Sequence, residues 1–211
     1  MKFNRSFLIF LVLGLVVEAC SSARLPATDI LFADDFSNTK NKWDQVSNNS
    51  IISNYFNDAY QMASNEVDSQ VWANPKDKSY TDTSVEVDAT KNGGPDDNDF
   101  GIICRYKGKD SFYYGVISCD GYYAISKMTP TGGKPIGNTR MLQSDKIATG
   151  PAINHIRFDC IGSTLTLYAN GYQLAQGTDT DYSSGNVGLI IGTFKDPGTD
   201  ILFDNFLVYK P

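Results

Sequence analysis

The segment from residue 153 to residue 176 limits the fold most, because its apolar and polar residues alternate through two short turns. Gly162-Ser163 and Asn170-Gly171 are two-residue turns of the kind that connect antiparallel strands. Counting outward from both turns places the apolar residues on one face of three consecutive strands. The expected opposing pairs are Cys160–Leu165, Phe158–Leu167, Leu167–Leu174 and Ala169–Tyr172.

Short predicted strands separated by turn residues continue along the rest of the chain, and no stretch keeps the apolar spacing of a helix. The clearest of them are 84–89, 100–106, 112–119, 122–127, 187–194 and 201–209. Roughly a dozen strands at this spacing are typical of a sandwich of two antiparallel sheets. No linker-like change of composition divides them, so the sequence predicts one all-β domain over residues 29–211.

The N-terminal residues predict export. A basic start precedes an apolar run over residues 7–17, which is short for a bilayer span and typical of a secretory signal. The stretch Val17-Glu18-Ala19-Cys20 resembles a bacterial lipoprotein signal at its first, third and fourth positions. The resemblance implies a signal peptide over 1–19, a lipid on Cys20, and a linker up to residue 28. The alternative is an ordinary cleaved signal in which Cys20 is incidental.

The charge balance of the chain indicates whether it can bind nucleic acid. The chain carries 18 Lys and Arg residues against 24 Asp and Glu residues, a formal charge of −6, and its body has no basic run. Proteins bind nucleic acids largely through Lys and Arg contacts to phosphate. The sequence therefore predicts no nucleic-acid partner.

Several segments resemble concanavalin A-like jelly rolls, in particular the laminin G-like and keto-disaccharide hydrolase-like branch. They are Phe32–Phe36, Gly101–Tyr106, Phe112–Tyr114, Asp120–Tyr123, Leu165–Gly171 and Phe203–Tyr209. The resemblance covers residues 29–210 and implies a jelly-roll sandwich whose first and last strands lie together. This fold hosts lectins, glycosidases and interaction modules, so it does not by itself define an activity.

Two adjacent tyrosine pairs lie in successive predicted strands, and alternation directs one member of each pair away from the core. Aromatic faces can stack on sugar C–H groups while polar side chains bind the hydroxyls. The alternative is that these rings only cover a sheet with β-favouring side chains. The candidate ligand-binding residues are Tyr113, Tyr114, Tyr122 and Tyr123, with Arg105, Asp120 and Trp72 as companions.

A glycosidase is the competing hypothesis. Retaining glycosidases use two carboxylates about 5–5.5 Å apart, and related glucanases take them from one strand as Glu-x-Asp followed by a second Glu. Glu86-Val87-Asp88 matches the first half, but no Glu follows near Thr90. We therefore favour a solvent-facing role for Glu86 and Asp88. The single His155 has no nucleophile motif beside it.

The resemblance also implies a structural calcium between the first and last strands, where carboxylates could serve as ligands. The matching residues are Asp34, Asp35 and Asp204. The acidic stretch 96–99 is a second possible cation site, but we favour a solvated turn there, because Asp and Asn are ordinary turn residues.

Export permits a disulfide among the three cysteines of the domain. A turn centred on Lys109 places Cys104 opposite about Tyr114, five residues from Cys119. That is roughly 16 Å at about 3.3 Å per residue. A disulfide needs about 4.4–6.8 Å between Cα atoms, which argues against this pair.

The direction in which the side chains point favours Cys160 as the disulfide partner of Cys104. Cys160 lies on the apolar face of its strand beside Phe158, and Cys104 shares the apolar face of its strand with Ile102. The resemblance agrees, because the Cys-Arg-Tyr and Cys-x-Gly segments look like a recurring pair in this branch. We predict a Cys104–Cys160 disulfide with Cys119 free.

Together these features predict an exported, lipid-anchored module at the bacterial cell envelope that binds glycan through a jelly-roll domain. A glycoside hydrolase that uses Glu86 and Asp88 is one alternative. A structural or protein-interaction module without catalysis is the other.

Overall fold

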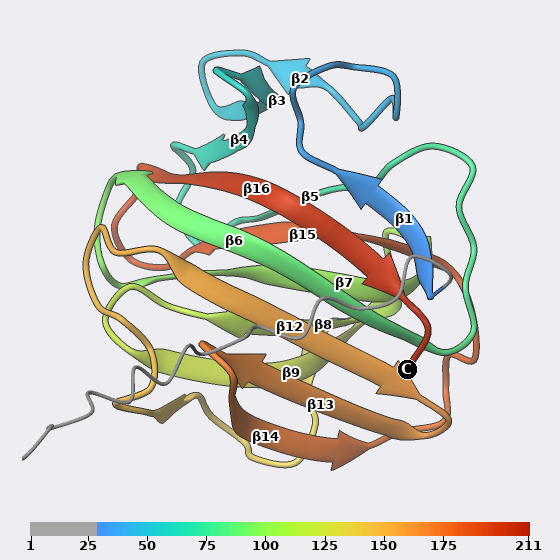
Figure 1. Ribbon diagram of the computed structural model, residues 1–211. Coiled ribbons are helices and arrows are strands. Elements are labelled where there is room, and N and C mark those ends of the chain that lie inside the picture. The colour runs from blue at the N-terminus through green and yellow to red at the C-terminus, as the bar shows by residue number, and fades with distance from the viewer. Residues whose placement is uncertain (1–28) are drawn as a thin grey trace, which may run out of the picture.

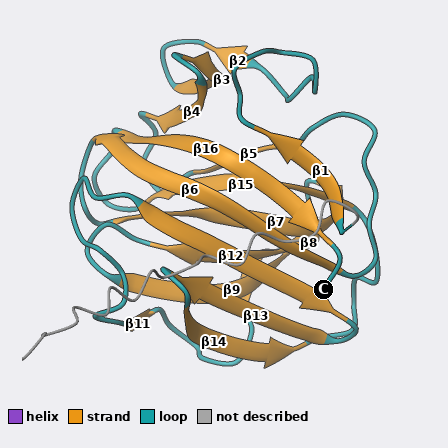
Figure 2. Ribbon diagram, in the orientation of Figure 1, coloured by secondary structure: helices purple, strands orange, loops and turns teal. Residues whose placement is uncertain are grey.

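The computed structural model describes residues 29–211, and this part of the chain consists of strands and loops without a helix (Figure 1 and Figure 2). The all-β prediction is therefore confirmed. The predicted signal peptide over 1–19, Cys20 and the linker lie outside the described residues. Within the described part, no helix is present that could cross a membrane.

Sheet A has nine strands, all paired antiparallel. Strand β1 (Ile30–Asp34) pairs with the last strand, as the resemblance implied. The remaining strands lie side by side in the order β14 (Tyr172–Thr178), β13 (Thr164–Ala169), β12 (Asn154–Ile161), β6 (Thr83–Gly93), β16 (Thr199–Tyr209), β4 (Ala59–Ser64), β3 (Ile51–Phe56) and β2 (Val46–Ser47).

Sheet B has seven strands and lies behind sheet A in the view of Figure 1. Its strands also pair antiparallel. They lie in the order β10 (Gly132–Pro135), β9 (Tyr122–Thr129), β8 (Ser111–Ile117), β7 (Asn98–Gly108), β15 (Asn186–Thr193) and β5 (Gln70–Ala73), while β11 (Leu142–Gln143) pairs with β9.

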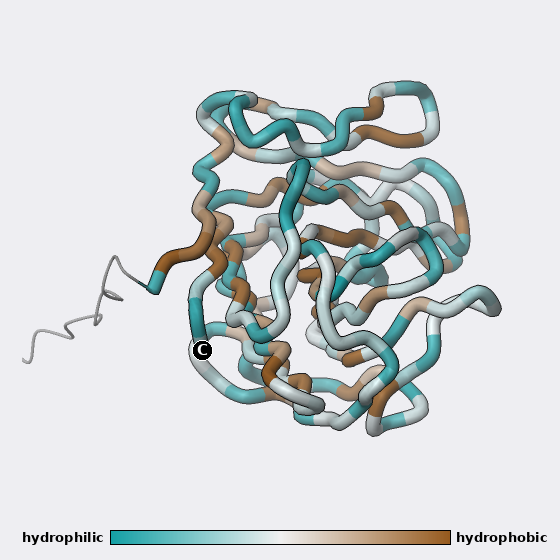
Figure 3. The backbone as a smooth tube through the Cα atoms, turned by 90° about the vertical axis from the view of Figure 1, so that its right-hand side faces the viewer, coloured by the Kyte–Doolittle hydropathy of each residue, from teal (hydrophilic) through white to brown (hydrophobic). Residues whose placement is uncertain are grey.

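The main core lies between the two sheets, where the chain is largely apolar (Figure 3). Alternation along each strand produces it: β6 buries Val85, Val87 and Ala89 completely and turns its polar residues outward. Gly115 on β8 lets the sheets approach each other, since a β-carbon there would lie 2.8 Å from Phe158 Cδ2.

The strand register agrees with the turn count in three of the four expected pairs. Cys160 opposes Leu165 and Phe158 opposes Leu167, and the second turn pairs Ala169 with Tyr172. The expectation for Leu167 is wrong, because a bulge after it shifts the register and places Ala175, not Leu174, opposite.

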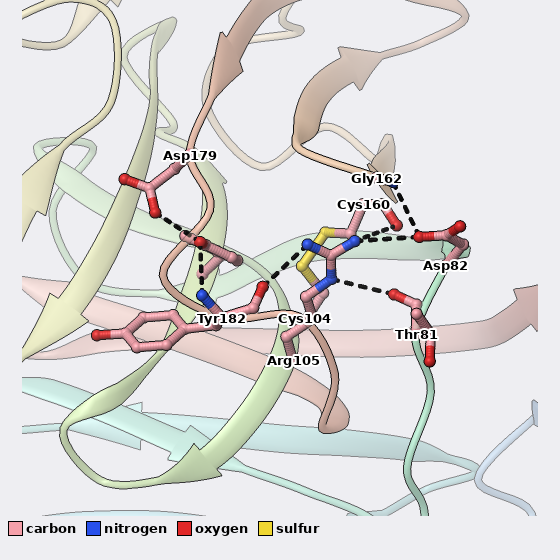
Figure 4. The surroundings of a disulfide bond; sticks show 9 residues. Thr81, Asp82, Cys104, Arg105, Cys160, Gly162, Asp179 and Tyr182 are labelled. Atoms are coloured by element: carbon pink, nitrogen blue, oxygen red, sulfur yellow. Dashed lines mark hydrogen bonds and ion pairs between the residues drawn. A yellow bond between two sulfur atoms is a disulfide. The ribbon is translucent and has the colours of Figure 1, made fainter.

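A disulfide joins Cys104 on β7 to Cys160 on β12 and so links the two sheets, as predicted (Figure 4). Cys119 is buried and free. The register around Cys104 differs by one from the expected one, since Cys104 opposes Tyr113. The irregularity follows Cys104, where Arg105 adopts a positive φ of 54°.

Candidate functional site

The outer face of sheet B carries a second apolar cluster, separate from the main core. Alternation produces it: Ile102 and Tyr113 point into the main core, whereas Ile103 and Tyr114 point outward. We call this set the outer cluster. Its members are Trp72, Ile103, Tyr106, Phe112, Tyr114, Val116, Ala124, Met128, Met141 and Ile190.

Aromatic side chains cover the middle of this face of sheet B. The rings of Trp72 on β5 and Phe112 on β8 lie 5.5 Å apart, although β15 and β7 separate their strands. They cover Ile190 and Ile103, which are fully buried on an outward face. Tyr114 adds a ring 5.9 Å from that of Phe112. The middle of the sheet is therefore covered by side chains and not open to solvent.

Beyond the outer cluster, one end of the same face is hollow. The end hollow has a volume of about 500 Å³. It forms where β7 and β9 begin and where β8 and β15 end, so its walls come from loops next to strand ends. The lining residues are Asp97, Asn98, Ser118, Asp120, Tyr122, Arg140, Met141 and Phe194.

Local hydrogen bonds hold one wall of the end hollow in place. The Ser118 hydroxyl donates to Asp120 Oδ1, and it accepts from the backbone N–H of Tyr122 at 2.8 Å. The Ser118 N–H donates to the Tyr122 carbonyl, also at 2.8 Å. Asp120-Gly121 turns the chain between them, with Gly121 at a φ of 92°. The tight turn presents Tyr122 outward with 37% of its surface exposed.

Arg140 is the cation of the end hollow. It comes from the loop between β10 and β11, and it forms no ion pair with any residue between 29 and 211. Met141 beside it packs against the outer cluster and fixes the end of this loop. The guanidinium donors of Arg140 are therefore free to bind a ligand.

The end hollow thus combines one exposed ring with carboxylates, an amide and a guanidinium. A sugar offers apolar C–H faces and hydroxyls that both donate and accept hydrogen bonds. An aromatic face with a few fixed polar groups is the arrangement that orients such a molecule.

The structure brings together only part of the candidate ligand-binding set. Tyr122 and Asp120 line the end hollow, while Tyr114 and Trp72 lie in the adjoining outer cluster. Tyr123 faces the main core. Thus one member of each tyrosine pair faces outward, as expected.

Two further candidates have structural roles. Tyr113 is buried; its hydroxyl donates to Asp179 Oδ1 at 2.6 Å and accepts from the Tyr182 N–H. Arg105 is 97% buried beside the disulfide, where its guanidinium donates to carbonyl oxygens of Thr81, Tyr182 and Cys160 (Figure 4). Neither is available to a ligand.

Glu86 and Asp88 lie on the outer face of sheet A, on the other side of the sandwich from the end hollow. His155 bridges them, with Nδ1 2.8 Å from Asp88 Oδ1 and Nε2 3.6 Å from Glu86 Oε2. Tyr209 donates to Glu86 and Asn205 to Asp88.

These contacts shift the pKa values of His155, Asp88 and Glu86. The hydrogen bonds to Asp88 and then Glu86 raise the pKa of His155 to about 9. The hydrogen bond with His155 lowers the pKa of Asp88. Burial raises the pKa of Glu86, but hydrogen bonds from His155 and Tyr209 outweigh it and the net shift is downward. A glycosidase acid needs a raised pKa, so this pair offers none.

The three carboxylates expected to hold calcium have other partners. Asp34 accepts from the Phe36 N–H and from Trp43 Nε1, both at 2.9 Å. Asp35 accepts from the Ser37 hydroxyl, and Asp204 Oδ1 accepts from the Asn205 N–H at 2.6 Å. Among residues 29–211, no group of three or more His, Cys, Asp or Glu side chains could hold a metal ion. Calcium binding between the first and last strands, which could also use backbone carbonyls, stays a prediction.

Of the eight residues that line the end hollow, sequence reasoning named only Asp120 and Tyr122 as ligand-binding candidates. Arg140, Met141 and Phe194 lie in loops or just after a strand, where no periodicity signals their direction. Asp97 lies in the predicted turn 96–99, but this turn ends early, because β7 starts at Asn98 and buries Asp99.

Comparison with known proteins supports the fold. No family model matches the sequence, and no curated protein sequence matches it significantly. Among solved structures, the carbohydrate-binding module CBM66 from Bacillus subtilis is similar, with a TM-score of 0.63 and 16% identity over 80% of this chain and 95% of that one.

Two further structures are similar at lower identity. A Bacillus subtilis protein of unknown function with a galectin-like fold has a TM-score of 0.62 and 8% identity, over 86% of this chain and 96% of that one. A β-glucanase from Bacillus licheniformis has a TM-score of 0.60 and 9% identity, over 85% and 97%. The domain therefore has the concanavalin A-like jelly-roll fold.

Proposed function

We propose that this domain binds glycan in the end hollow of sheet B. The observation that carries the proposal is the hollow itself, in which Tyr122 is exposed between Asp120, Asp97 and the unpaired Arg140. The similar solved structures include a carbohydrate-binding module and a glucanase, which supports a glycan over other small polar ligands.

The shape of the face defines the binding mode. The outer cluster fills the middle of sheet B, so a ligand contacts the sheet only at the end hollow. Tyr122 would stack on one ring face, and Arg140 with the two carboxylates would bind hydroxyls.

Replacing Tyr122 tests this proposal. Tyr122→Ala should weaken binding to glycans selected from an array by about tenfold, which corresponds to about 1.4 kcal/mol. Unfolding free energy should change little, because the ring is partly exposed. The matched control is Tyr172→Ala on sheet A, whose ring is 55% exposed and which should leave binding unchanged.

Other outcomes identify the competing hypotheses. Equal losses of stability and affinity would show that the Tyr122 ring is a packing residue. Hydrolysis of the bound glycan would favour the glycosidase. Absence of binding to any array glycan would favour a structural or protein-contact module.

We also propose that the domain is exported and attached to the cell envelope by a lipid on Cys20. The support is the apolar run that ends at Val17-Glu18-Ala19-Cys20. Mass spectrometry of the mature protein should find acyl mass on Cys20, and a mature N-terminus beyond Cys20 would contradict the proposal.

A further inference from the structure

A second hollow adjoins the end hollow. It has a volume of about 470 Å³ and lies between the Asp120-Gly121 turn, β11 and the loop that follows β11. We call it the corner hollow. Its lining includes Asp120, Gly121, Gln143, Ser144, Asp145 and Thr149. Asp120 lines both hollows, so they meet at this residue.

The strand register places the two hollows side by side. Tyr122 on β9 and Gln143 on β11 oppose each other directly. Opposed residues of an antiparallel pair point to the same face, with their β-carbons about 4.5–5.5 Å apart. Tyr122 lines the end hollow, Gln143 lines the corner hollow, and both are exposed. An exposed ring in one hollow therefore lies next to an exposed amide in the other.

Backbone hydrogen bonds fix the position of the corner hollow relative to the end hollow. The Ser144 N–H donates to the Gly121 carbonyl at 2.9 Å, and the Gly150 N–H donates to the Cys119 carbonyl at 2.8 Å. Both bonds join the loop after β11 to the turn between β8 and β9. Ile147, in the middle of this loop, is buried in the main core. The two hollows are therefore parts of one preformed surface.

The corner hollow offers hydrogen-bonding groups that suit sugar hydroxyls. The exposed side chains of Gln143 and Thr149 can each donate and accept, and the Asp145 carboxylate accepts. A sugar unit stacked on Tyr122 would bring the next unit of the same chain within reach of these groups.

The charges that line the two hollows are mainly negative. Asp97, Asp120 and Asp145 contribute three carboxylates, against one guanidinium from Arg140. Lys146 beside the corner hollow is already paired with Asp145, with Nζ 3.3 Å from Oδ1. Like charges brought together across an interface oppose binding. The surface therefore disfavours a glycan that carries carboxylate, sulfate or phosphate groups.

We propose that the ligand is a neutral glycan chain that lies across both hollows, with one unit on Tyr122 and the next beside Gln143. The inference rests on the proposed function and adds a chain length and a charge to it. A single sugar would fill only the end hollow, whereas a chain gains further contacts in the corner hollow.

The main test measures affinity against chain length. Saccharides of one to six units, cut from a neutral glycan selected on an array, are titrated into the protein and followed by amide NMR. The wild type should bind the longer chains about tenfold more tightly than the monosaccharide, because the added units form further hydrogen bonds.

One variant and a matched control assign this gain to the corner hollow. Gln143→Ala should weaken binding of the longer chains by about fivefold and should affect the monosaccharide much less. Gln173→Ala removes an exposed glutamine on β14, outside both hollows, and should behave as the wild type.

The same spectra locate the contacts without a variant. The monosaccharide should shift the amide signal of Tyr122, and the longer chains should also shift those of Ser144 and Thr149. Longer chains that leave Ser144 and Thr149 unshifted would overturn the proposal.

The remaining outcomes separate this inference from the proposed function. Affinity that is independent of chain length, while Tyr122→Ala still weakens binding, would overturn the inference and spare the proposed function. So would a gain with length that Gln143→Ala leaves intact, or equally tight binding of array glycans that carry uronic or sialic acids. Absence of any glycan binding would overturn both.

Discussion

The outer faces of the two sheets differ, although the same alternation produces both. On sheet A, the outward acids Glu86, Asp88 and Asp159 are paired: His155 bridges the first two, and Arg157 forms two hydrogen bonds with Asp159. On sheet B, the outward residues are mainly aromatic and aliphatic, and the one buried acid among them, Asp99, has an unpartnered oxygen.

The difference separates a solvated exterior from the face that we propose for binding. Paired charges on a half-exposed surface satisfy one another and leave nothing for a ligand to complete. Buried rings beside a hollow, with unpaired polar groups at its edge, leave hydrogen bonds that only a ligand or water can make. Three measurements can break or sharpen this contrast.

The largest expected effect on the unfolding free energy comes from the disulfide that links the two sheets. Cys104 and Cys160 are 56 residues apart, so the bond should contribute about 4 kcal/mol on the chain-entropy account. The double variant C104A/C160A should lose this much in denaturant unfolding monitored by tryptophan fluorescence. A loss below about 1 kcal/mol would show that the sheets do not depend on the link.

The next effect tests whether the outer cluster of sheet B is a true core. Phe112 is fully buried there against Trp72, Tyr106 and Tyr114, so Phe112→Ala should lower the unfolding free energy by about 3 kcal/mol. The matched variant on sheet A is Tyr168→Ala.

Tyr168 stacks under Arg157, with the guanidinium carbon 4.4 Å from the ring centre, on a partly exposed face. Its removal should cost less than about 1 kcal/mol. Similar losses for the two variants would remove the distinction between the faces.

The smallest effect concerns the paired charges of sheet A. Because its partners raise the pKa of His155 from 6.5 to about 9, the stability that it contributes is fully present below pH 6.5. That stability is lost as pH rises through about 9. Its side chain is 45% exposed, so solvent screening limits the effect to about 1 kcal/mol.

Unfolding at pH 6, 8 and 10 would measure this loss. His155→Gln should flatten the decline between pH 6.5 and pH 9, because the amide does not titrate. An unchanged decline in that variant would show that other groups, such as Tyr209, cause it.

Much of the fold could be predicted from the sequence, because β-structure depends on local alternation and turn chemistry. The turns at Gly162-Ser163 and Asn170-Gly171 determine three strands and most of their register. The same alternation identified Cys104 and Cys160 as inward-facing and hence as disulfide partners. It also directed one member of each tyrosine pair away from the core and put Glu86 with Asp88 on one face of their strand, which is the outer face.

The tertiary structure decided whether the outward side chains of each sheet are exposed to solvent or buried by other side chains. Alternation predicts that a side chain leaves the core, but not whether other strands bury it again, as Trp72 and Phe112 do for Ile103 and Ile190. Bulges, such as the one after Leu167, depend on how neighbouring strands twist together. The end hollow joins loops that are far apart in the chain, so only packing could bring Arg140, Tyr122 and Phe194 to one place.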